Sequence, residues 1–351
     1  MSVLSPEDGR WLDAAARYAA PFVGTTADNP AVAALVVDPR SQTLVARAVT
    51  ARGGRPHAEA EALARAGFEA AGCTLYVTLE PCHHWGRTPP CVQAIIRSGI
   101  MRVVIGASDP DARSAGGTVK QLESAGIETL LAEHGPSQAL HAGHISRHAA
   151  GRPFVTAVMH RCDEAGSPAS GSEAQRWVNM LRTRSDAVLL GAATTRHLDH
   201  GLSVALPGLA GRTPLRVVLV GASGIDRSVN LIGDFSGYRT AVIAETNAKV
   251  DVPVSVETIR IDGKNGRPDL HAALRALAAR SIQSLLVEPG PRLAAAILKA
   301  NLVDRFAVIR RINADGDAGP AADLPATAGL AEVHRQTLGD DELTLYERSV
   351  S

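Results

Sequence analysis

Aromatic residues are scarce in this chain, since phenylalanine, tryptophan and tyrosine make up 3% of its 351 residues. A protein that binds single-stranded nucleic acid usually offers aromatic side chains on which bases stack. Charge of one sign is not in excess either, because 36 lysines and arginines balance 36 aspartates and glutamates. The sequence therefore offers no basic stripe for a phosphate backbone or a membrane surface. We expect neither nucleic acid nor membrane as a partner.

Long apolar runs are also missing, and none approaches the roughly 20 residues of a membrane-spanning helix. The first ten residues are polar and acidic, unlike the apolar segment of a signal peptide. The chain has four cysteines, which are too few for the disulfide framework of a short secreted protein. We expect a cytoplasmic protein with reduced thiols, in which Cys73 and Cys162 are buried.

The first part of the chain alternates between helical and extended patterns. Helices are expected at 11–20, 57–71, 91–98 and 118–125, and strands at 31–38, 44–49, 74–79 and 102–107. This alternation predicts an α/β layered domain with a largely parallel sheet. The segment 134–152 is rich in histidine, alanine and glycine, and we place the domain boundary there, with domains at 1–148 and 149–351.

The pattern restarts after this boundary and predicts a second α/β domain. Strands are expected at 154–159, 186–191, 215–220, 239–244, 283–288 and 305–310, and helices at 173–183, 269–280 and 291–300. The stretch 313–329 is rich in alanine, glycine, aspartate and proline and is expected to be a mobile loop.

The most informative pattern joins His57 and Glu59 to two later cysteines. The chain reads His57-Ala58-Glu59, then Thr78-Leu79-Glu80-Pro81-Cys82, and then Cys91. One imidazole and two thiolates are the three protein ligands of a catalytic zinc site, in which a fourth position stays open. A histidine two residues before a glutamate, followed by a proline–cysteine pair and a second cysteine, is typical of zinc-dependent deaminases. The sequence predicts His57, Cys82 and Cys91 as zinc ligands and Glu59 as the residue that moves protons.

The spacing of the two cysteines allows a second interpretation. Eight residues separate them, where the usual deaminase motif has two. A structural zinc site would require a fourth protein ligand, which His83 or His84 could supply. We favour the catalytic interpretation because Glu59 would have no role in a closed site. Three later histidines are expected to be solvated or to cap helices rather than to bind metal: His141, His144 and His148.

The string TLEPCHHWGRTPPC, at 78–91, resembles the deaminase half of the bifunctional riboflavin-biosynthesis deaminase/reductase. The segments at 29–32, 56–59 and 151–156 also resemble that family. The resemblance implies a cytidine-deaminase-like three-layer α/β/α domain followed by a dihydrofolate-reductase-like α/β domain. It implies zinc-dependent deamination of 2,5-diamino-6-(5-phosphoribosylamino)pyrimidin-4-one and an NADPH-dependent reduction of the ribose. A small phosphorylated pyrimidine would then be the substrate.

The same resemblance implies three residues that bind substrate. Asn29 would hold the pyrimidine or the ribose, and His84 and Arg87 would lie near the phosphate. A guanidinium suits this role because it binds phosphate through two parallel hydrogen bonds, although Arg87 could also be a solvated loop residue. The chain departs from the family at Thr50, where the family has a histidine, and Arg52 or Arg55 could hold the phosphate instead. This departure affects the exact substrate, not the type of reaction.

The C-terminal half resembles the reductase at 181–187 and 286–291 but lacks its working residues. Val158 stands where the family has a lysine, and the family's S-L-D-G string and a later serine- and glycine-rich stretch are absent. Proline replaces a glycine at Pro289, which removes a backbone donor and restricts φ. The residues left for a reductase-like site are Asp199, Glu288 and Gly290. Our hypothesis is an inactive reductase in which Asp199 and Glu288 are structural relics, and NADPH stays an open cofactor.

Four functions compete on these observations. A deaminase with a degenerate reductase is the main hypothesis, and a fully bifunctional enzyme is the first alternative. Thr50 motivates a third, a deaminase of a related amino-heterocycle. The fourth is that the C-terminal half serves only for assembly, as a homodimer in which the strand at 305–310 takes part. Deamination of a nucleic-acid base is disfavoured by the composition.

Overall fold

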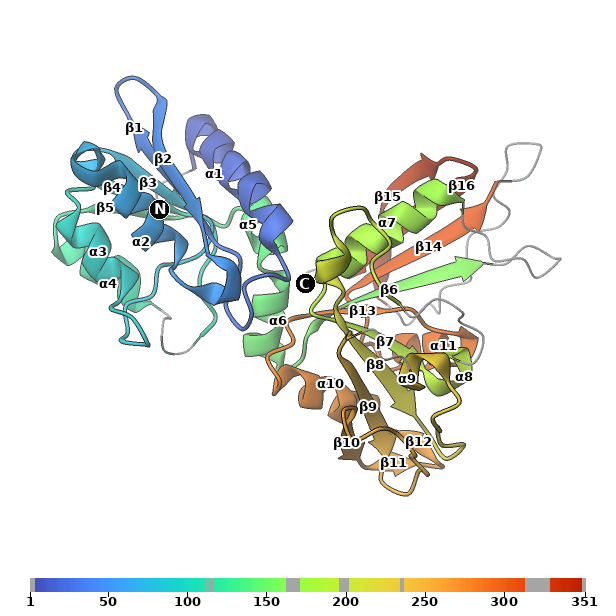
Figure 1. The fold of residues 1–351 in the computed structure, drawn as a ribbon. Coiled ribbons are helices and arrows are strands. Elements are labelled where there is room, and N and C mark those ends of the chain that lie inside the picture. Colours follow the sequence, from blue (N-terminus) through green and yellow to red (C-terminus); the bar gives the residue numbers. More distant parts are fainter. Residues whose placement is uncertain are drawn as a thin grey trace. The chain divides into compact units, whose positions relative to one another are not determined.

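The computed structural model describes residues 4–111, 113, 116–161, 171–195, 202–233, 237–312 and 329–348. The chain divides into two compact units, Met1–Gly151 and Arg152–Ser351. Each unit is built around one large sheet covered by helices (Figure 1). Within the described residues, every helix is too short or too polar to cross a bilayer.

The N-terminal unit contains a five-stranded sheet in the order β2-β1-β3-β4-β5. Its strands are β1 (Ala33–Asp38), β2 (Thr43–Val49), β3 (Thr74–Val77), β4 (Arg102–Ile105) and β5 (Glu128–Leu131). Strands β3, β4 and β5 are parallel, but β1 runs antiparallel to both of its neighbours. The expectation of a largely parallel sheet was therefore wrong for this unit. The short turn after β1 explains the difference, since a tight connection joins antiparallel strands.

Helices cover both faces of this sheet. Helices α1 (Pro6–Ala19) and α5 (Gly135–Leu140) lie on one face, and α2 (Ala58–Ala66), α3 (Cys91–Arg97) and α4 (Gly117–Ser124) lie on the other (Figure 1). Short 3-10 turns lie at Ala20–Phe22, Arg52–Gly54 and Gly67–Ala70. The alanines of α2 bury small side chains against β1 and β2, which lets the helix approach the sheet closely.

The segment 134–152, in which we placed the domain boundary, is mostly helical. It forms α5 and then α6 (Ala142–Ala150), both inside the N-terminal unit. His141 and His144 are buried there and so are not solvated, and His141 lies at the N-cap of α6 without a capping hydrogen bond from its side chain. His141 Nε2 lies 3.0 Å from Thr78 Oγ1, and burial lowers the pKa of His141 to about 3. A neutral, hydrogen-bonded histidine can replace an apolar side chain in a core.

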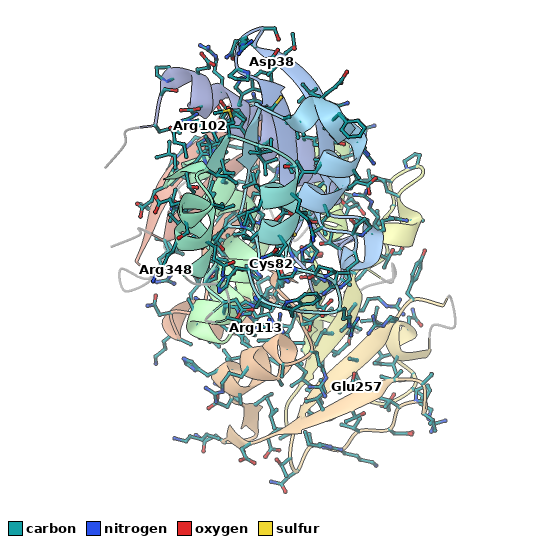
Figure 2. All side chains as sticks on the ribbon, turned by 90° about the vertical axis from the view of Figure 1, so that its left-hand side faces the viewer. Asp38, Cys82, Arg102, Arg113, Glu257 and Arg348 are labelled. Carbon is teal, nitrogen blue, oxygen red and sulfur yellow. The ribbon has the colours of Figure 1, made fainter. Side chains whose placement is uncertain are left out.

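Asp8 ties helix α1 to the sheet. Its carboxylate accepts hydrogen bonds from Arg102 at 2.6 and 3.1 Å and from the Tyr76 hydroxyl at 2.9 Å. Arg102 is labelled in Figure 2. Ser5 caps the helix by accepting the Asp8 N–H at 3.0 Å. Helix α1 therefore begins at Pro6 and not at the expected residue 11. A serine N-cap followed by proline at the first helical position favours helix initiation.

The Asp8 network predicts a loss of stability in acid. Burial tends to raise the pKa of Asp8, but hydrogen bonds from Arg102, Ser5 and Tyr76 outweigh it and lower the pKa to about 2. A lowered carboxyl pKa stabilises the fold above the unfolded value near 4, and this contribution is lost as the pH falls from about 4 to 2. Asp8→Asn is expected to cost about 2 kcal/mol at pH 7 and much less at pH 2.5. Thermal unfolding at both pH values measures the difference.

The control for this prediction is Glu61→Gln, which removes an exposed ion pair with Arg65 on α2. Exposed pairs contribute little to stability. An Asp8→Asn penalty that is the same at pH 7 and pH 2.5 would contradict the proposed ion-pair origin.

The C-terminal unit contains a nine-stranded sheet in the order β10-β9-β8-β7-β13-β6-β14-β16-β15. The parallel strands are β6 (Phe154–Arg161), β7 (Ala187–Gly191), β8 (Leu215–Val220), β9 (Thr240–Glu245), β10 (Glu257–Ile261), β13 (Ser284–Val287) and β14 (Arg305–Arg311). The antiparallel hairpin β15 (Leu330–Leu338) and β16 (Asp341–Arg348) completes the sheet. A separate two-stranded ribbon is made of β11 (Gly263–Lys264) and β12 (Arg267–Pro268).

Helices again cover both faces. Helices α10 (Leu270–Ala278) and α11 (Pro291–Lys299) lie on one face, and α7 (Ser172–Thr183), α8 (Ala192–Thr195) and α9 (Asn230–Gly233) on the other (Figure 1). A short 3-10 turn lies at Ala210–Arg212. Strand β14, which corresponds to the expected interface strand 305–310, is interior because β6 and β16 flank it. Its backbone is already paired on both sides, so it cannot add a strand from another copy.

Candidate zinc centre and substrate pocket

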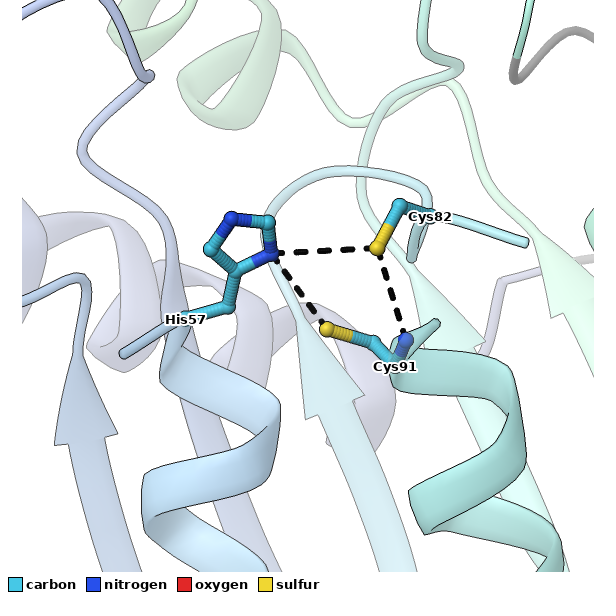
Figure 3. A group of neighbouring side chains, drawn as sticks. All are labelled: His57, Cys82 and Cys91. Atoms are coloured by element: carbon cyan, nitrogen blue, oxygen red, sulfur yellow. Dashed lines mark hydrogen bonds between the residues drawn. The ribbon is translucent and has the colours of Figure 1, made fainter. Parts of the chain in front are cut away.

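Three side chains that lie far apart in the sequence meet in the N-terminal unit. His57 Nδ1 lies 3.8 Å from Cys82 Sγ and 3.4 Å from Cys91 Sγ. Figure 3 shows the imidazole and the two thiols turned toward one another. Their ligand atoms all lie within 4.8 Å of one another, and no other set of histidine, cysteine and acidic side chains does so among the described residues.

The local fold of each segment explains this convergence. His57 immediately precedes α2, Cys91 is the first residue of α3, and Cys82 lies on the loop that follows β3. The backbone N–H of Cys91 donates a hydrogen bond to Cys82 Sγ, with 3.4 Å between the nitrogen and the sulfur. The N-terminal amides of a helix carry partial positive charge, which stabilises a nearby thiolate. The fold therefore favours ionised sulfur at this point.

The electrostatics of the two thiols favour the binding of a cation. A hydrogen bond from Cys91 lowers the pKa of Cys82 to about 4, with a further contribution from His57. The same contact with Cys82, together with burial, raises the pKa of Cys91. Two adjacent sulfurs resist carrying negative charge together, and a divalent metal ion removes that conflict.

The donor set fits zinc. Tetrahedral zinc takes sulfur at about 2.3 Å and imidazole nitrogen at about 2.0 Å, which sets these atoms about 3.6 Å apart. The distances from His57 Nδ1 to the sulfurs bracket this value. His83 is not placed as a fourth ligand, because its ring lies against α4, where a Cβ on Gly117 would be 2.3 Å from Nε2. The three-ligand arrangement is that of a catalytic site.

Glu59 lies in the first turn of α2, two residues after His57. Its side chain is buried, with 3% of the residue exposed, and it lines the same cavity as His57 and Cys82. Burial raises the pKa of the Glu59 carboxyl, while the charge of His57 opposes this shift. A carboxyl that holds a proton more readily than usual is suited to proton transfer in both directions.

A cavity of about 480 Å³ opens beside this cluster. All three residues expected to bind substrate line it, namely Asn29, His84 and Arg87. The side chain of Asn29 packs closely against the backbone of Gly54, where a Cβ would lie 2.3 Å from Asn29 Nδ2. Gly54 also has a φ of +89°, which favours glycine. Thr50 also lines the cavity, but its hydroxyl accepts the Val32 N–H at 3.1 Å.

Sequence reasoning missed an entire wall of this cavity. It consists of residues from the loop after β4 and from helix α6: Asp109, Asp111, Arg113, His144, Arg147 and His148. Figure 2 labels Arg113 and Cys82, which belong to this one cavity. The dipeptide Asp109-Pro110 was the available signal, but the histidines of α6 were expected to be solvated or to cap helices. Helix α6 follows the last strand of the sheet, so only the fold brings it to the site.

The residues expected at a reductase-like site are differently placed. Glu288 forms a bidentate ion pair with Arg182 of α7. Arg182 Nε donates to Glu288 Oε1 and Arg182 Nη2 donates to Oε2, each at 2.7 Å. Gly290 precedes α11, and a Cβ there would lie 2.7 Å from Thr194 Oγ1. Val158 belongs to β6 and lies in the core, with 1% of the residue exposed. Asp199 and Cys162 lie outside the described residues.

Comparisons with known proteins agree with this division of the chain. Residues 6–107 match the family described as the cytidine and deoxycytidylate deaminase zinc-binding region, and residues 158–310 match the RibD C-terminal domain. The riboflavin biosynthesis protein RibD of Escherichia coli (strain K12) is 33% identical over 332 residues, which are 88% of this chain and 89% of that protein. RibD of Aquifex aeolicus is 30% identical and covers 97% of this chain and 98% of its own length.

A solved structure shows the same architecture. The diaminohydroxyphosphoribosylaminopyrimidine deaminase/5-amino-6-(5-phosphoribosylamino)uracil reductase of Thermotoga maritima has a TM-score of 0.83 and 26% identity, over 98% of this chain and 99% of that one. RibD of Acinetobacter baumannii has a TM-score of 0.80 and 25% identity with the same coverage. The fold class expected from the sequence, a deaminase-like domain followed by a reductase-like domain, is confirmed.

Proposed function

The chain belongs to the RibD family of bifunctional riboflavin-biosynthesis enzymes, and we propose that its N-terminal unit deaminates 2,5-diamino-6-(5-phosphoribosylamino)pyrimidin-4-one. The observation that carries this proposal is one cavity lined by ligands of a three-ligand metal site, a buried glutamate and several cationic side chains. An open zinc site beside a proton-transfer group hydrolyses an amino-heterocycle, and the cations suit a phosphorylated substrate.

His57, Cys82 and Cys91 would hold the zinc ion, which when bound acts as a Lewis acid and makes water a strong nucleophile at neutral pH. Glu59 would accept the proton that the attacking water loses and pass it to a nitrogen of the ring. It would then accept the proton of the newly added hydroxyl group and deliver it to the departing amino group, so that ammonia leaves and a carbonyl remains. The burial of Glu59 supports this role because no bulk water competes for the proton.

The phosphate end of the substrate would bind to Arg87 with help from Arg55. Both line the cavity, and Arg55 Nη1 donates to Thr88 Oγ1 at 2.8 Å, on the loop that carries Arg87 and His84. Thr50, which replaces the family's histidine, has its hydroxyl bound to the Val32 N–H just before β1 and carries no charge. The arginines therefore supply the positive charge that a phosphate requires.

We propose further that the C-terminal unit does not reduce the ribose with NADPH. Val158 gives the cofactor no cation, because it is apolar and buried. The Glu288 carboxylate is already paired with Arg182, and Pro289 has no backbone N–H to donate. These residues do not fit a working dinucleotide site.

The test supplies the purified protein with the diaminopyrimidinone ribosylamino phosphate and follows ammonia release and NADPH oxidation together. We expect ammonia release without NADPH consumption. Consumption of NADPH would show that the changes at Val158 and Pro289 are tolerated and that the enzyme is bifunctional. Release of no ammonia from zinc-loaded protein would refute this substrate and favour the related amino-heterocycle that Thr50 suggests.

We also propose that two copies assemble through the C-terminal unit, at β15 rather than at β14. Strand β15 forms one end of the sheet, and most of its residues are exposed. An edge strand of nine residues offers unpaired N–H and C=O groups to another strand.

A further inference from the structure

His144 and Asp109 form a buried pair in the wall of the deaminase cavity. His144 Nε2 lies 2.9 Å from Asp109 Oδ1, and the two side chains are 7% and 12% exposed. Both residues line the cavity that contains the zinc ligands. A histidine and a carboxylate so little exposed take their orientation from each other and from their protein partners, not from solvent.

The pair is connected to the strand end beside the zinc cluster. Asp109 Oδ1 also accepts the Asp111 N–H at 3.0 Å, and the Asp109 N–H donates to Glu80 Oε2 at 3.2 Å. Glu80 is buried and lies two residues before Cys82. The Asp109 carboxylate is thus held by His144 and by the Asp111 N–H, while the Asp109 backbone is tied to the segment that leads to Cys82.

The donor in this pair is identified by elimination. A carboxylate can only accept, so His144 must donate from Nε2. His144 Nδ1 is buried and has no hydrogen-bond partner among the described residues. A proton on Nδ1 would be buried without an acceptor, so Nε2 is the nitrogen that carries the proton of this hydrogen bond. The donated hydrogen bond fixes the position of the Asp109 carboxylate.

We propose that His144 is a positioning residue for substrate binding, which holds the Asp109 carboxylate as an acceptor for N–H or O–H donors of the substrate. The inference rests on the proposed deaminase function. Carboxylates are well suited to bind sugar hydroxyls and amino groups. The substrate carries O–H donors on its ribose and N–H donors on its ring. The residues that would hold zinc are not needed to bind either kind of donor. The pair would therefore act on affinity rather than on the chemical step.

The test compares two variants of the same position in the full-length, zinc-loaded protein. The amide nitrogen of glutamine can take the place of His144 Nε2, whereas the shorter asparagine cannot reach Asp109. We expect His144→Asn to raise KM for the ribosylamino phosphate by about tenfold or more, as loss of a hydrogen bond to a charged group implies. We expect kcat to change by less than about threefold, and His144→Gln to restore KM.

The matched control is His141→Asn. His141 is equally buried and loses one hydrogen bond to Thr78, but it does not line the cavity. Its KM is expected to stay at the wild-type value. An equal rise of KM in His141→Asn, an unchanged KM in His144→Asn, or a His144→Gln that behaves like the asparagine variant would overturn the proposal.

Two further measurements separate this proposal from the function on which it rests. Sugar-free 2,5,6-triaminopyrimidin-4-one identifies the donor: the effect of His144→Asn disappears with this compound if the ribose donates and persists if the ring donates. Calorimetric binding of the ribosylamino phosphate to Glu59→Gln protein, with and without His144→Asn, needs no turnover. Wild-type protein that binds this compound but releases no ammonia refutes the proposed reaction, while equal binding with and without His144→Asn refutes the role of His144.

Discussion

Replacement of Glu59 with glutamine is expected to lower the rate of ammonia release by about a thousandfold, within the range of roughly 10² to 10⁴ that general acid–base catalysis contributes. Glutamine has nearly the same shape but can neither accept nor deliver the proton. Because Glu59 is buried in the first turn of α2 and is not a metal ligand, the fold and the zinc content should persist. Steady-state kinetics with metal analysis of the same sample measures both.

Glu61→Gln is the control for this variant. Glu61 lies on the same helix, and its carboxylate pairs with Arg65 at 2.9 Å near the surface. Activity within about twofold of wild type is expected, since exposed pairs contribute little. A Glu59→Gln enzyme with near wild-type turnover and full zinc would disprove proton transfer by Glu59.

Replacement of Cys91 with serine is expected to remove zinc and abolish activity, with a loss of at least about two orders of magnitude. Serine is a poor ligand because its hydroxyl stays protonated at neutral pH, whereas the thiolate is the form that binds metal. Cys91 also starts α3, so metal loss should loosen the contact between this helix and the loop of Cys82. Metal content, ammonia release and the thermal midpoint are the measurements.

Cys73→Ser provides a matched comparison. Cys73 is also buried, but its sulfur contacts the Glu69 carbonyl and lies outside the metal cluster. It should keep full zinc and activity, with at most a modest fall in stability. A Cys91→Ser protein that retains stoichiometric zinc would exclude Cys91 as a ligand.

The convergence of His57, Cys82 and Cys91 was predictable because the evidence for it is local. His57 and Glu59 share one turn, and each cysteine follows a strand or starts a helix, so spacing alone indicates a common site. The cavity wall at α6 was not predictable in this way. His144 is buried because a carboxylate 35 residues away in the sequence accepts its hydrogen bond, and no local pattern encodes that partner.

Strands at the margins of both sheets escaped detection for a different reason. Strand β5 is only four residues long, and β15 has most of its residues exposed on both faces. Neither shows the alternation of apolar and polar residues that marks a half-buried strand. By contrast, β8 and β9 are mostly apolar and almost fully buried, and they matched their expected ranges closely. A strand that is buried on both faces is marked in the sequence by mostly apolar residues, whereas a strand with most of its residues exposed has no such mark.

The burial of Val158 limits what can be built at this position of the second unit. This side chain packs under β6 among apolar neighbours such as Leu190 and Leu286. A lysine introduced there would have to enter a closed core, where an unpaired ammonium is strongly disfavoured. Its introduction would therefore require changes in the surrounding side chains as well. A single substitution cannot supply a usable cation at this position, so any engineering of cofactor binding into this unit must begin with redesign of the core around Val158.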